Sequence, residues 1–171
     1  RARHSPRWPS EIFKAVGIDE DRFLTMIPSQ QTSFSMINVR NGTAESYAIN
    51  GAESSGNFYR ARDGRIWMGG LKSVIAFWPN ERTSKRYVIS SGVENGELYS
   101  EIVDRISESP DGRVWAFTDY GKYVLDPQSD QFVFQKPQGT FRDFIIQDAV
   151  LDFIPSRDGK TWVYGYRELG T

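Results

Sequence analysis

The chain has 171 residues, a net charge of −1, 39% hydrophobic residues, 14% aromatic residues and no cysteine. Its apolar content is sufficient for the core of one folded domain, and its near-neutral charge argues against a nucleic-acid partner or an anionic membrane surface. The absence of cysteine excludes a disulfide framework, and no apolar run approaches the ~18 residues of a membrane span, so direct membrane insertion of this segment is not expected.

The first fifty residues carry the weakest pattern. Residues 1–10 are basic and contain two prolines, which predicts a linker or tail. Residues 11–50 contain short apolar runs, and Asn41-Gly42 between the last two is a strong hairpin signal. We predict a degenerate four-stranded unit over 11–50, and a short helix over 9–16, capped by Ser10, is the alternative at its start.

The next unit, residues 55–90, has a clearer pattern of strands and turns. Turns are predicted at Asp63-Gly64, Gly69-Gly70 and Pro79-Asn80 because glycine, proline, aspartate and asparagine favour turns. The predicted strands are 58–61, 65–68, 74–78 and 85–89. Residues 91–99 are expected to be a loop to the following unit.

A second clear unit covers residues 101–136, and a further one begins in residues 148–171. The predicted strands of the second unit are 102–108, 113–118, 122–125 and 131–135. The last unit offers strands near 151–155 and 161–164. Its outer two strands are missing from the sequence.

One motif, Asp-Gly-[Arg/Lys]-x-Trp, recurs in the three later units. Its copies contain Asp63, Gly64 and Trp67; Asp111, Gly112 and Trp115; and Asp158, Gly159 and Trp162. The tryptophans are 48 and 47 residues apart. A period of roughly 40 to 50 residues with strand-like content is typical of radial repeats built from four-stranded blades. The predicted fold is therefore all-β, a propeller segment of about three and a half blades belonging to one larger propeller.

The sequence around the second motif resembles the two-component-regulator propeller repeat. The resemblance rests on Asp111-Gly-Arg-Val-Trp-Ala-Phe-Thr118, followed by Gly121 to Asp126-Pro127 and the apolar Phe132. It covers about residues 55–171. Such repeats form the extracytoplasmic sensor half of bacterial hybrid histidine kinases and related signalling proteins, often as two propellers built from fourteen blades. The resemblance thus implies a seven-bladed propeller, a periplasmic or extracellular location and a role in sensing, not catalysis.

Two other propeller families share part of this pattern. Ser156 to Trp162 nearly matches the sialidase-type Asp-box but lacks one residue between Asp158 and Gly159. Streptogramin-lyase-like propellers carry similar repeats, and that resemblance implies a catalytic histidine and Mg²⁺. The only histidine here is His4, in the predicted tail. A lyase-like or glycosidase-like enzyme and a protein-interaction scaffold stay as the alternatives to a sensor.

The repeated motif residues are interpreted as structural. Glycine allows a positive φ and aspartate bonds its own turn, whereas one tryptophan per blade at the same strand position serves packing between blades. No known catalytic, phosphate-binding or metal-binding motif is present. We therefore expect no catalytic residue, no metal and no cofactor.

Blade geometry predicts which loops could bind a ligand. The Asp-Gly turns fall on one face of a propeller, and the longer connections fall on the other. The candidate ligand-binding residues on that second face are Lys72, Tyr99, Tyr120, Lys122, Arg142, Tyr166 and Arg167. Aromatic and cationic side chains suit a small anionic molecule or an oligosaccharide.

The predicted function is ligand sensing by a non-catalytic propeller segment of a bacterial receptor. A run of three and a half blades leaves apolar sheet faces uncovered at its ends. We therefore expect the segment to pack against the remaining blades of a parent polypeptide or to self-associate. The sequence begins without methionine and stops inside a repeat, which favours the parent polypeptide.

Overall fold

The computed structural model describes residues 14–27, 33–47, 57–89, 93–94, 97–98, 102–118, 121–135, 150–155, 160–165 and 169–170. Every regular element in these ranges is a β-strand, which confirms the all-β expectation. No helix in the described ranges has the length and hydrophobicity needed to cross a membrane. The predicted limits of the units all fall on residues outside these ranges, so they stay predictions.

Three complete antiparallel sheets, called blades here, follow one another along the chain, each with its strands in sequence order. Blade 1 consists of β1 (Lys14–Gly17), β2 (Arg22–Ile27), β3 (Ser33–Asn38) and β4 (Thr43–Tyr47). Blade 2 consists of β5 (Phe58–Arg60), β6 (Ile66–Gly70), β7 (Ser73–Trp78) and β8 (Thr83–Val88). Blade 3 consists of β11 (Val103–Glu108), β12 (Val114–Thr118), β13 (Gly121–Asp126) and β14 (Gln131–Phe134).

A fourth sheet has three strands among the described residues. It contains β15 (Val150–Pro155), β16 (Thr161–Gly165) and the short β17 (Leu169–Gly170). The copy of the motif in this sheet places Trp162 in β16, opposite Ile154, as Trp115 stands opposite Ser107 in blade 3. The chain thus has the alternating strands and turns of a propeller segment.

Several details differ from the sequence-based expectation. Gly69 and Gly70 end strand β6 and do not form a turn, and the last sheet has a third strand, β17, where both outer strands were expected to be missing. Residues 14–17 form strand β1, so the alternative helix over 9–16 is wrong for its described part. The predicted loop 91–99 contains two short strands, β9 (Val93–Glu94) and β10 (Glu97–Leu98), which pair with each other. In the sequence Asn95-Gly96 stands between them, and such a pair is a signal for a hairpin.

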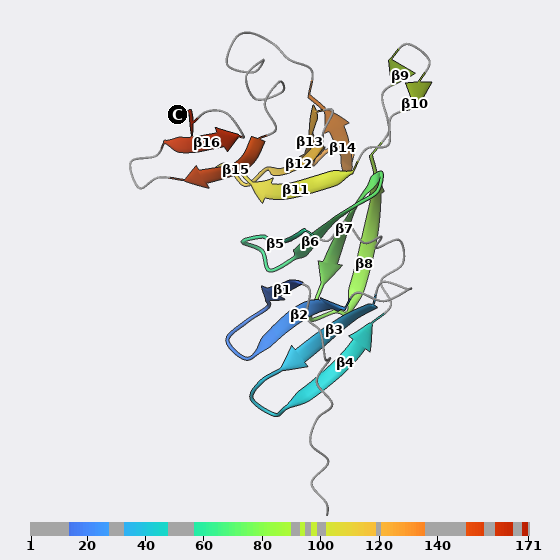
Figure 1. The fold of residues 1–171 in the computed structure, drawn as a ribbon, viewed down its shortest axis with the longest axis vertical. Helices are drawn as coiled ribbons and strands as arrows, with labels where there is room; N and C mark the ends of the chain where they lie inside the picture. The colour runs from blue at the N-terminus through green and yellow to red at the C-terminus, as the bar shows by residue number, and fades with distance from the viewer. Residues whose placement is uncertain are drawn as a thin grey trace, which may run out of the picture.

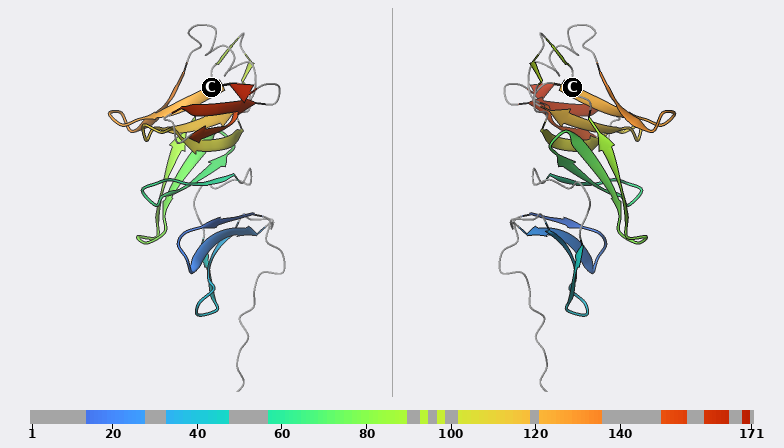
Figure 2. Two further views of the ribbon diagram at one scale, coloured as in Figure 1. Left: turned by 90° about the vertical axis from the view of Figure 1, so that its left-hand side faces the viewer. Right: turned by 90° about the vertical axis from the view of Figure 1, so that its right-hand side faces the viewer.

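The blades are stacked one on the next along the longest axis of the molecule (Figure 1). The first strand of each blade contacts the first strand of the next, because β5 touches both β1 and β11, and β11 touches β15. Figure 2 shows the same succession of sheets from the two sides. First strands that meet in this way are expected of a propeller, where they surround the axis.

Blades 1 and 2 are joined by an apolar layer. Phe34 of β3 meets Phe58 of β5 edge-to-face, with ring centroids 5.9 Å apart, and Tyr47 lies 6.3 Å from Phe77. The other buried members of this layer are Ile18, Leu24, Met26 and Met36 from blade 1 and Ile66, Met68 and Ile75 from blade 2. The period of two along each strand directs these residues to one face.

A second apolar layer joins blades 2 and 3, and aromatic residues form its centre. Phe132 of blade 3 packs edge-to-face against Trp67, at 5.9 Å between centroids, and against Tyr87, at 5.5 Å, both in blade 2. The Trp67 side chain is fully buried. Offset and edge-to-face pairs of this kind add to the free energy gained by burying apolar area. Trp67 therefore packs between blades 2 and 3 in the structure.

The close approach of blades 2 and 3 requires a residue without a side chain at position 69. A Cβ atom on Gly69 of β6 would lie 2.3 Å from the carbonyl oxygen of Val103 at the start of β11. Next to this point, Leu71 forms an isolated antiparallel bridge with Ile102. Glycine at position 69 thus allows β6 and β11 to touch through their backbones.

Gly69→Ala is expected to lower the free energy of unfolding by about 1–3 kcal/mol, because β11 must move away to relieve the overlap. Denaturant unfolding followed by circular dichroism measures the loss. Gly17→Ala is the matched control, since no atom lies within 4 Å of the corresponding Cβ. Equal effects of the two substitutions would contradict the close packing of β6 on β11.

Candidate functional site

The Asp-Gly-Arg-x-Trp motif builds a self-contained turn in blade 2. Gly64 has a φ of 87°, which glycine adopts without strain. Asp63 accepts hydrogen bonds from the backbone N–H of Arg65 at 3.0 Å and from its Nε at 2.6 Å. The Arg65 guanidinium carbon in turn lies 4.9 Å from the centre of the Trp67 ring. The motif therefore joins a glycine turn, the Asp63–Arg65 ion pair and the buried Trp67 ring within one short segment.

Blade 3 repeats this arrangement with small changes. Gly112 has a φ of 84°, Asp111 accepts a hydrogen bond from Arg113 Nε at 2.7 Å, and the Arg113 guanidinium carbon lies 5.5 Å from the Trp115 ring centre. Asp158 and Gly159 of the third copy lie outside the described residues. Within the described residues, no group of three or more acidic or histidine side chains could hold a metal ion.

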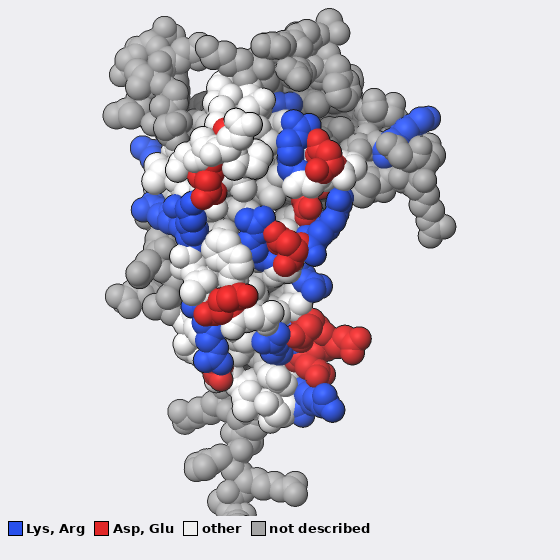
Figure 3. Space-filling view, turned by 180° about the vertical axis from the view of Figure 1, so that it is seen from behind, with Lys and Arg blue, Asp and Glu red and all other residues white. Residues whose placement is uncertain are grey.

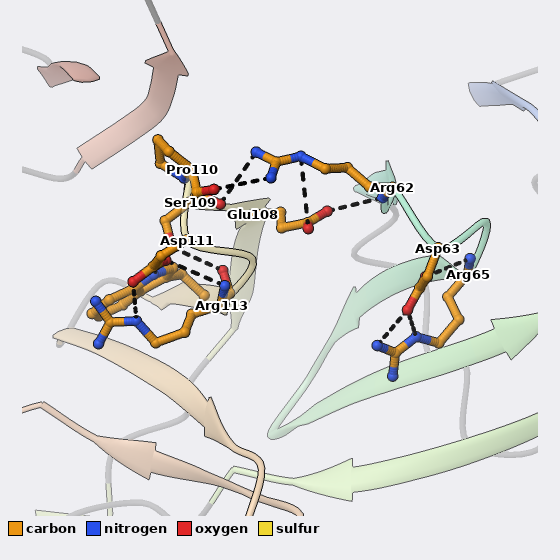
Figure 4. A network of polar contacts seen from close by, with 9 residues as sticks. Arg62, Asp63, Arg65, Glu108, Ser109, Pro110, Asp111 and Arg113 are labelled. Atoms are coloured by element: carbon orange, nitrogen blue, oxygen red, sulfur yellow. Dashed lines mark hydrogen bonds and ion pairs between the residues drawn. The ribbon is translucent and has the colours of Figure 1, made fainter. Parts of the chain in front are cut away.

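A polar contact between blades 2 and 3 lies beside these turns (Figure 4). The backbone N–H of Arg62 donates to Glu108 Oε2 at 2.9 Å, and its guanidinium donates to the carbonyl of Pro110 at 3.0 Å. Arg62 Nε also lies 3.8 Å from Glu108 Oε1, and the Glu108 side chain is only 8% exposed. Because a carboxylate this buried needs partners, Arg62 holds the first turn of one blade against the first turn of the next.

Charged groups on the face that contains the Asp-Gly turns are largely paired with one another. Arg22 donates to Asp19 within its own turn and to Asn80 Oδ1 of blade 2 at 2.9 Å. The Arg22 side chain lowers the pKa of Asp19, and hydrogen bonds from Ser109 and then Arg113 lower the pKa of Asp111. Seen from behind, Lys and Arg are interspersed with Asp and Glu, with no extended region of one sign (Figure 3). The paired charges of the Asp-Gly turns leave little unpaired charge there for a ligand.

The candidate ligand-binding residues were predicted on the opposite face, and of these only Lys72 and Lys122 lie in the described ranges. Lys72 lies in the β6–β7 turn with a φ of 52°, is partly exposed, and its carbonyl accepts a hydrogen bond from Ile89 at 2.9 Å. The exposed Leu71 and Ile102 lie beside it. The candidates that fall outside the described residues are Tyr99, Tyr120, Arg142, Tyr166 and Arg167.

Lys122 is buried within β13 and is not displayed on a loop. Its Nζ lies 5.2 Å from the centre of the Trp115 ring, and its side chain is 6% exposed. The strand registers place it where blade 2 has the core residue Val74. A buried cation over an indole ring fits a cation–π contact within the blade. Its role in binding stays a prediction, and it is not brought beside Lys72.

The two described tryptophans of the motif differ in how their ring N–H is satisfied. Trp115 Nε1 donates to Ser109 Oγ at 3.0 Å. Trp67 Nε1 is buried and has no hydrogen-bond partner within the described part of the chain. Ala61 stands two residues before Asp63, as Ser109 stands two before Asp111. The alanine therefore removes the acceptor that blade 3 provides.

The fold recurs in solved structures. The extracellular domain of BT4673 from B. thetaiotaomicron, described as part of a hybrid two component system, matches over 96% of this chain with a TM-score of 0.69 and 12% identity. That of BT3049, described likewise and from the same organism, matches over 91% with a TM-score of 0.59 and 15% identity. PorZ, a surface component of the type-IX secretion system of Porphyromonas gingivalis, matches over 90% with a TM-score of 0.52 and 13% identity.

The chain is a β-propeller segment. It spans about a fifth of each of these structures, 21% of the BT4673 domain, 19% of the BT3049 domain and 23% of PorZ. The first two neighbours agree with the resemblance to the two-component-regulator propeller repeat. No protein-family model and no curated protein matches the sequence.

Ala61→Ser is expected to stabilise the propeller segment by about 1 kcal/mol, because the new hydroxyl can accept the buried Trp67 N–H. Thermal unfolding measures the change. Ser109→Ala is the reverse control and should cost about 1–3 kcal/mol by leaving Trp115 Nε1 without its acceptor. A destabilising Ala61→Ser would mean that the site next to Trp67 has no room for a hydroxyl.

Acid is expected to destabilise the chain below about pH 4. The folded-state pKa values of Asp111 and Asp130 lie below the ordinary 3.8, Asp111 because of Ser109 and Arg113 and Asp130 because of Lys85. Their contribution is complete above pH 3.8 and is lost as the pH falls through the lowered pKa values, since the unfolded chain binds protons first.

Unfolding midpoints measured from pH 6 to pH 2 test this. Asp111→Asn and Asp130→Asn should each flatten the loss of stability below pH 3.8. Glu81→Gln is the control, because Glu81 is an exposed acid in the β7–β8 turn. An unchanged acid profile in both aspartate variants would show that their pairs do not form in solution.

Proposed function

We propose that this chain is a ligand-sensing, non-catalytic segment of the propeller domain of an extracytoplasmic bacterial receptor. The observation that carries the proposal is the shared fold over 96% of the chain with the extracellular domain of BT4673. That neighbour is described as part of a hybrid two component system, which supports a sensing role. The signal would pass to other domains of the parent polypeptide.

The arrangement of charge supports binding on the loop face. Around the Asp-Gly turns, Arg62, Arg65 and Arg113 are each engaged with a carboxylate. The opposite face contains the partly exposed Lys72 beside the exposed Leu71 and Ile102. A cation next to apolar surface suits a molecule that has both a negative or hydroxyl-rich part and an apolar part.

The ligand class follows from the residues predicted on this face. Tyr99, Tyr120 and Tyr166 would stack on sugar rings, and Arg142 and Arg167 would pair with carboxylates or sulfates. We propose a small anion or an acidic oligosaccharide. Binding without turnover fits a sequence whose one histidine, His4, stands in the predicted tail.

A binding screen on the intact parent protein tests the proposal. Thermal shift against neutral oligosaccharides, acidic oligosaccharides and small anions should give a hit among the acidic compounds. Lys72→Ala and Tyr120→Ala should each weaken that binding about fivefold or more, as expected of residues at a binding centre.

Arg40→Ala is the matched control, because Arg40 is an 81% exposed cation in the β3–β4 turn. Loss of binding in Arg40→Ala but not in Lys72→Ala would overturn the assignment of the face. Cleavage of a bound oligosaccharide would favour the enzyme alternative. The absence of any small-molecule binding together with a stable protein complex would favour a scaffold.

A further inference from the structure

In each of the three complete blades, the last residue of the turn between the third and fourth strands has a positive φ. These residues are Gly42 with φ 69°, Arg82 with φ 56° and Asp130 with φ 51°. Each directly precedes the first paired residue of the fourth strand, as the registers of β4, β8 and β14 show. The three positions are therefore structurally equivalent. A non-glycine residue with positive φ is uncommon, and a residue as long as Arg82 at such a position calls for a reason.

Arg82 and Asp130 each reach back to the preceding blade. Arg82 Nη2 of blade 2 lies 3.0 Å from Glu45 Oε2 of blade 1. Asp130 of blade 3 pairs with the Lys85 ammonium of blade 2 and accepts a hydrogen bond from the Tyr87 hydroxyl at 3.1 Å. We call Arg82 and Asp130 the reaching residues, and Glu45 and Lys85 the receiving residues.

The receiving residues are also equivalent, and their charges are opposite. Glu45 is the third residue of β4 and Lys85 the third residue of β8, and each is followed two positions later by a tyrosine. The pair between blades 1 and 2 therefore has a negative receiver and a positive reaching residue. The pair between blades 2 and 3 has the reverse polarity.

We propose that this alternation of polarity determines which blade packs on which, and that it prevents a second copy of the chain from taking the place of a neighbouring blade. Blade 2 carries a positive receiver, Lys85, and a positive reaching residue, Arg82, so two copies of blade 2 repel each other at this position. Blade 1 against blade 3 would oppose Glu45 to Asp130. Only the order found in the chain brings opposite charges together at both interfaces.

Exposure explains why the pairs act on choice of neighbour more than on stability. The four side chains are 41–58% exposed, and exposed pairs contribute little to folding because water and salt screen them. The layers between blades differ in composition but are both apolar, and because apolar contact is not directional, a wrong neighbour would lose little of it. Repulsion between like charges at the rim of the interface raises the free energy of a complex with the wrong blade.

Charge swaps separate this role from a simple stabilising effect. Lys85→Glu with Asp130→Lys, and separately Glu45→Arg with Arg82→Glu, restore opposite charges at every native interface and leave the net charge unchanged. Each double variant, however, gives both interfaces the same polarity, so blade 2 becomes complementary to a second copy of itself. The quadruple variant alternates again, with all four charges inverted.

Sedimentation velocity of the full chain at low and high salt is the test, with unfolding midpoints recorded in parallel. Both double variants should unfold near the wild type but self-associate roughly tenfold more tightly at low salt, because a like-charge contact becomes an ion pair, and high salt should reverse the increase. The quadruple variant should return to the wild-type profile.

The proposal would be overturned if both double variants sedimented like the wild type at low salt. Equal self-association of the quadruple and double variants would also overturn it, because altered charges as such would then be the cause. If one double variant does not fold, the other decides the question, since it changes a different interface.

Discussion

The structure depends on apolar layers between neighbouring sheets. A four-stranded sheet in the middle of the segment has two apolar faces, and each must be covered by another sheet. Blade 2 meets this requirement on both sides, with Ile66 and Met68 directed toward blade 1 and Trp67 toward blade 3. Because one strand serves two layers, the blades cannot be treated as independent domains.

Polar contacts join the turns of neighbouring blades at the edges of these layers. Arg62 connects the first turns of blades 2 and 3, whereas Arg82 and Asp130 connect the outer turns to preceding blades. These contacts occupy the charged groups around the Asp-Gly turns. The longer connections on the opposite face are then the part of the surface where residues can vary without loosening the blades, which is where we propose that the ligand binds.

Local patterns predicted the fold well. The Asp-Gly turns at 63–64 and 111–112, and strands such as β11 within two residues, follow from interactions between near neighbours in sequence. Contacts such as Arg62 with Glu108 could not be predicted, since the two residues are 46 positions apart and their meeting depends on how the blades stack. Blade geometry predicts Lys122 on the loop face because it follows the connection between the second and third strands, whereas the structure buries it. Alternation with Val124 along β13 was the signal that could have placed it on a packing face.

Native-state hydrogen exchange of Phe132→Ala tests the central claim, that the blades are held as one unit by the layers between them. Phe132 belongs to blade 3 but packs on Trp67 and Tyr87 of blade 2. The account predicts faster exchange in β7 of blade 2 as well as in β13 of blade 3, while the β2 and β3 amides of blade 1 change less. Faster exchange confined to blade 3 would contradict it, because blade 2 would then be stable without the layer that it shares.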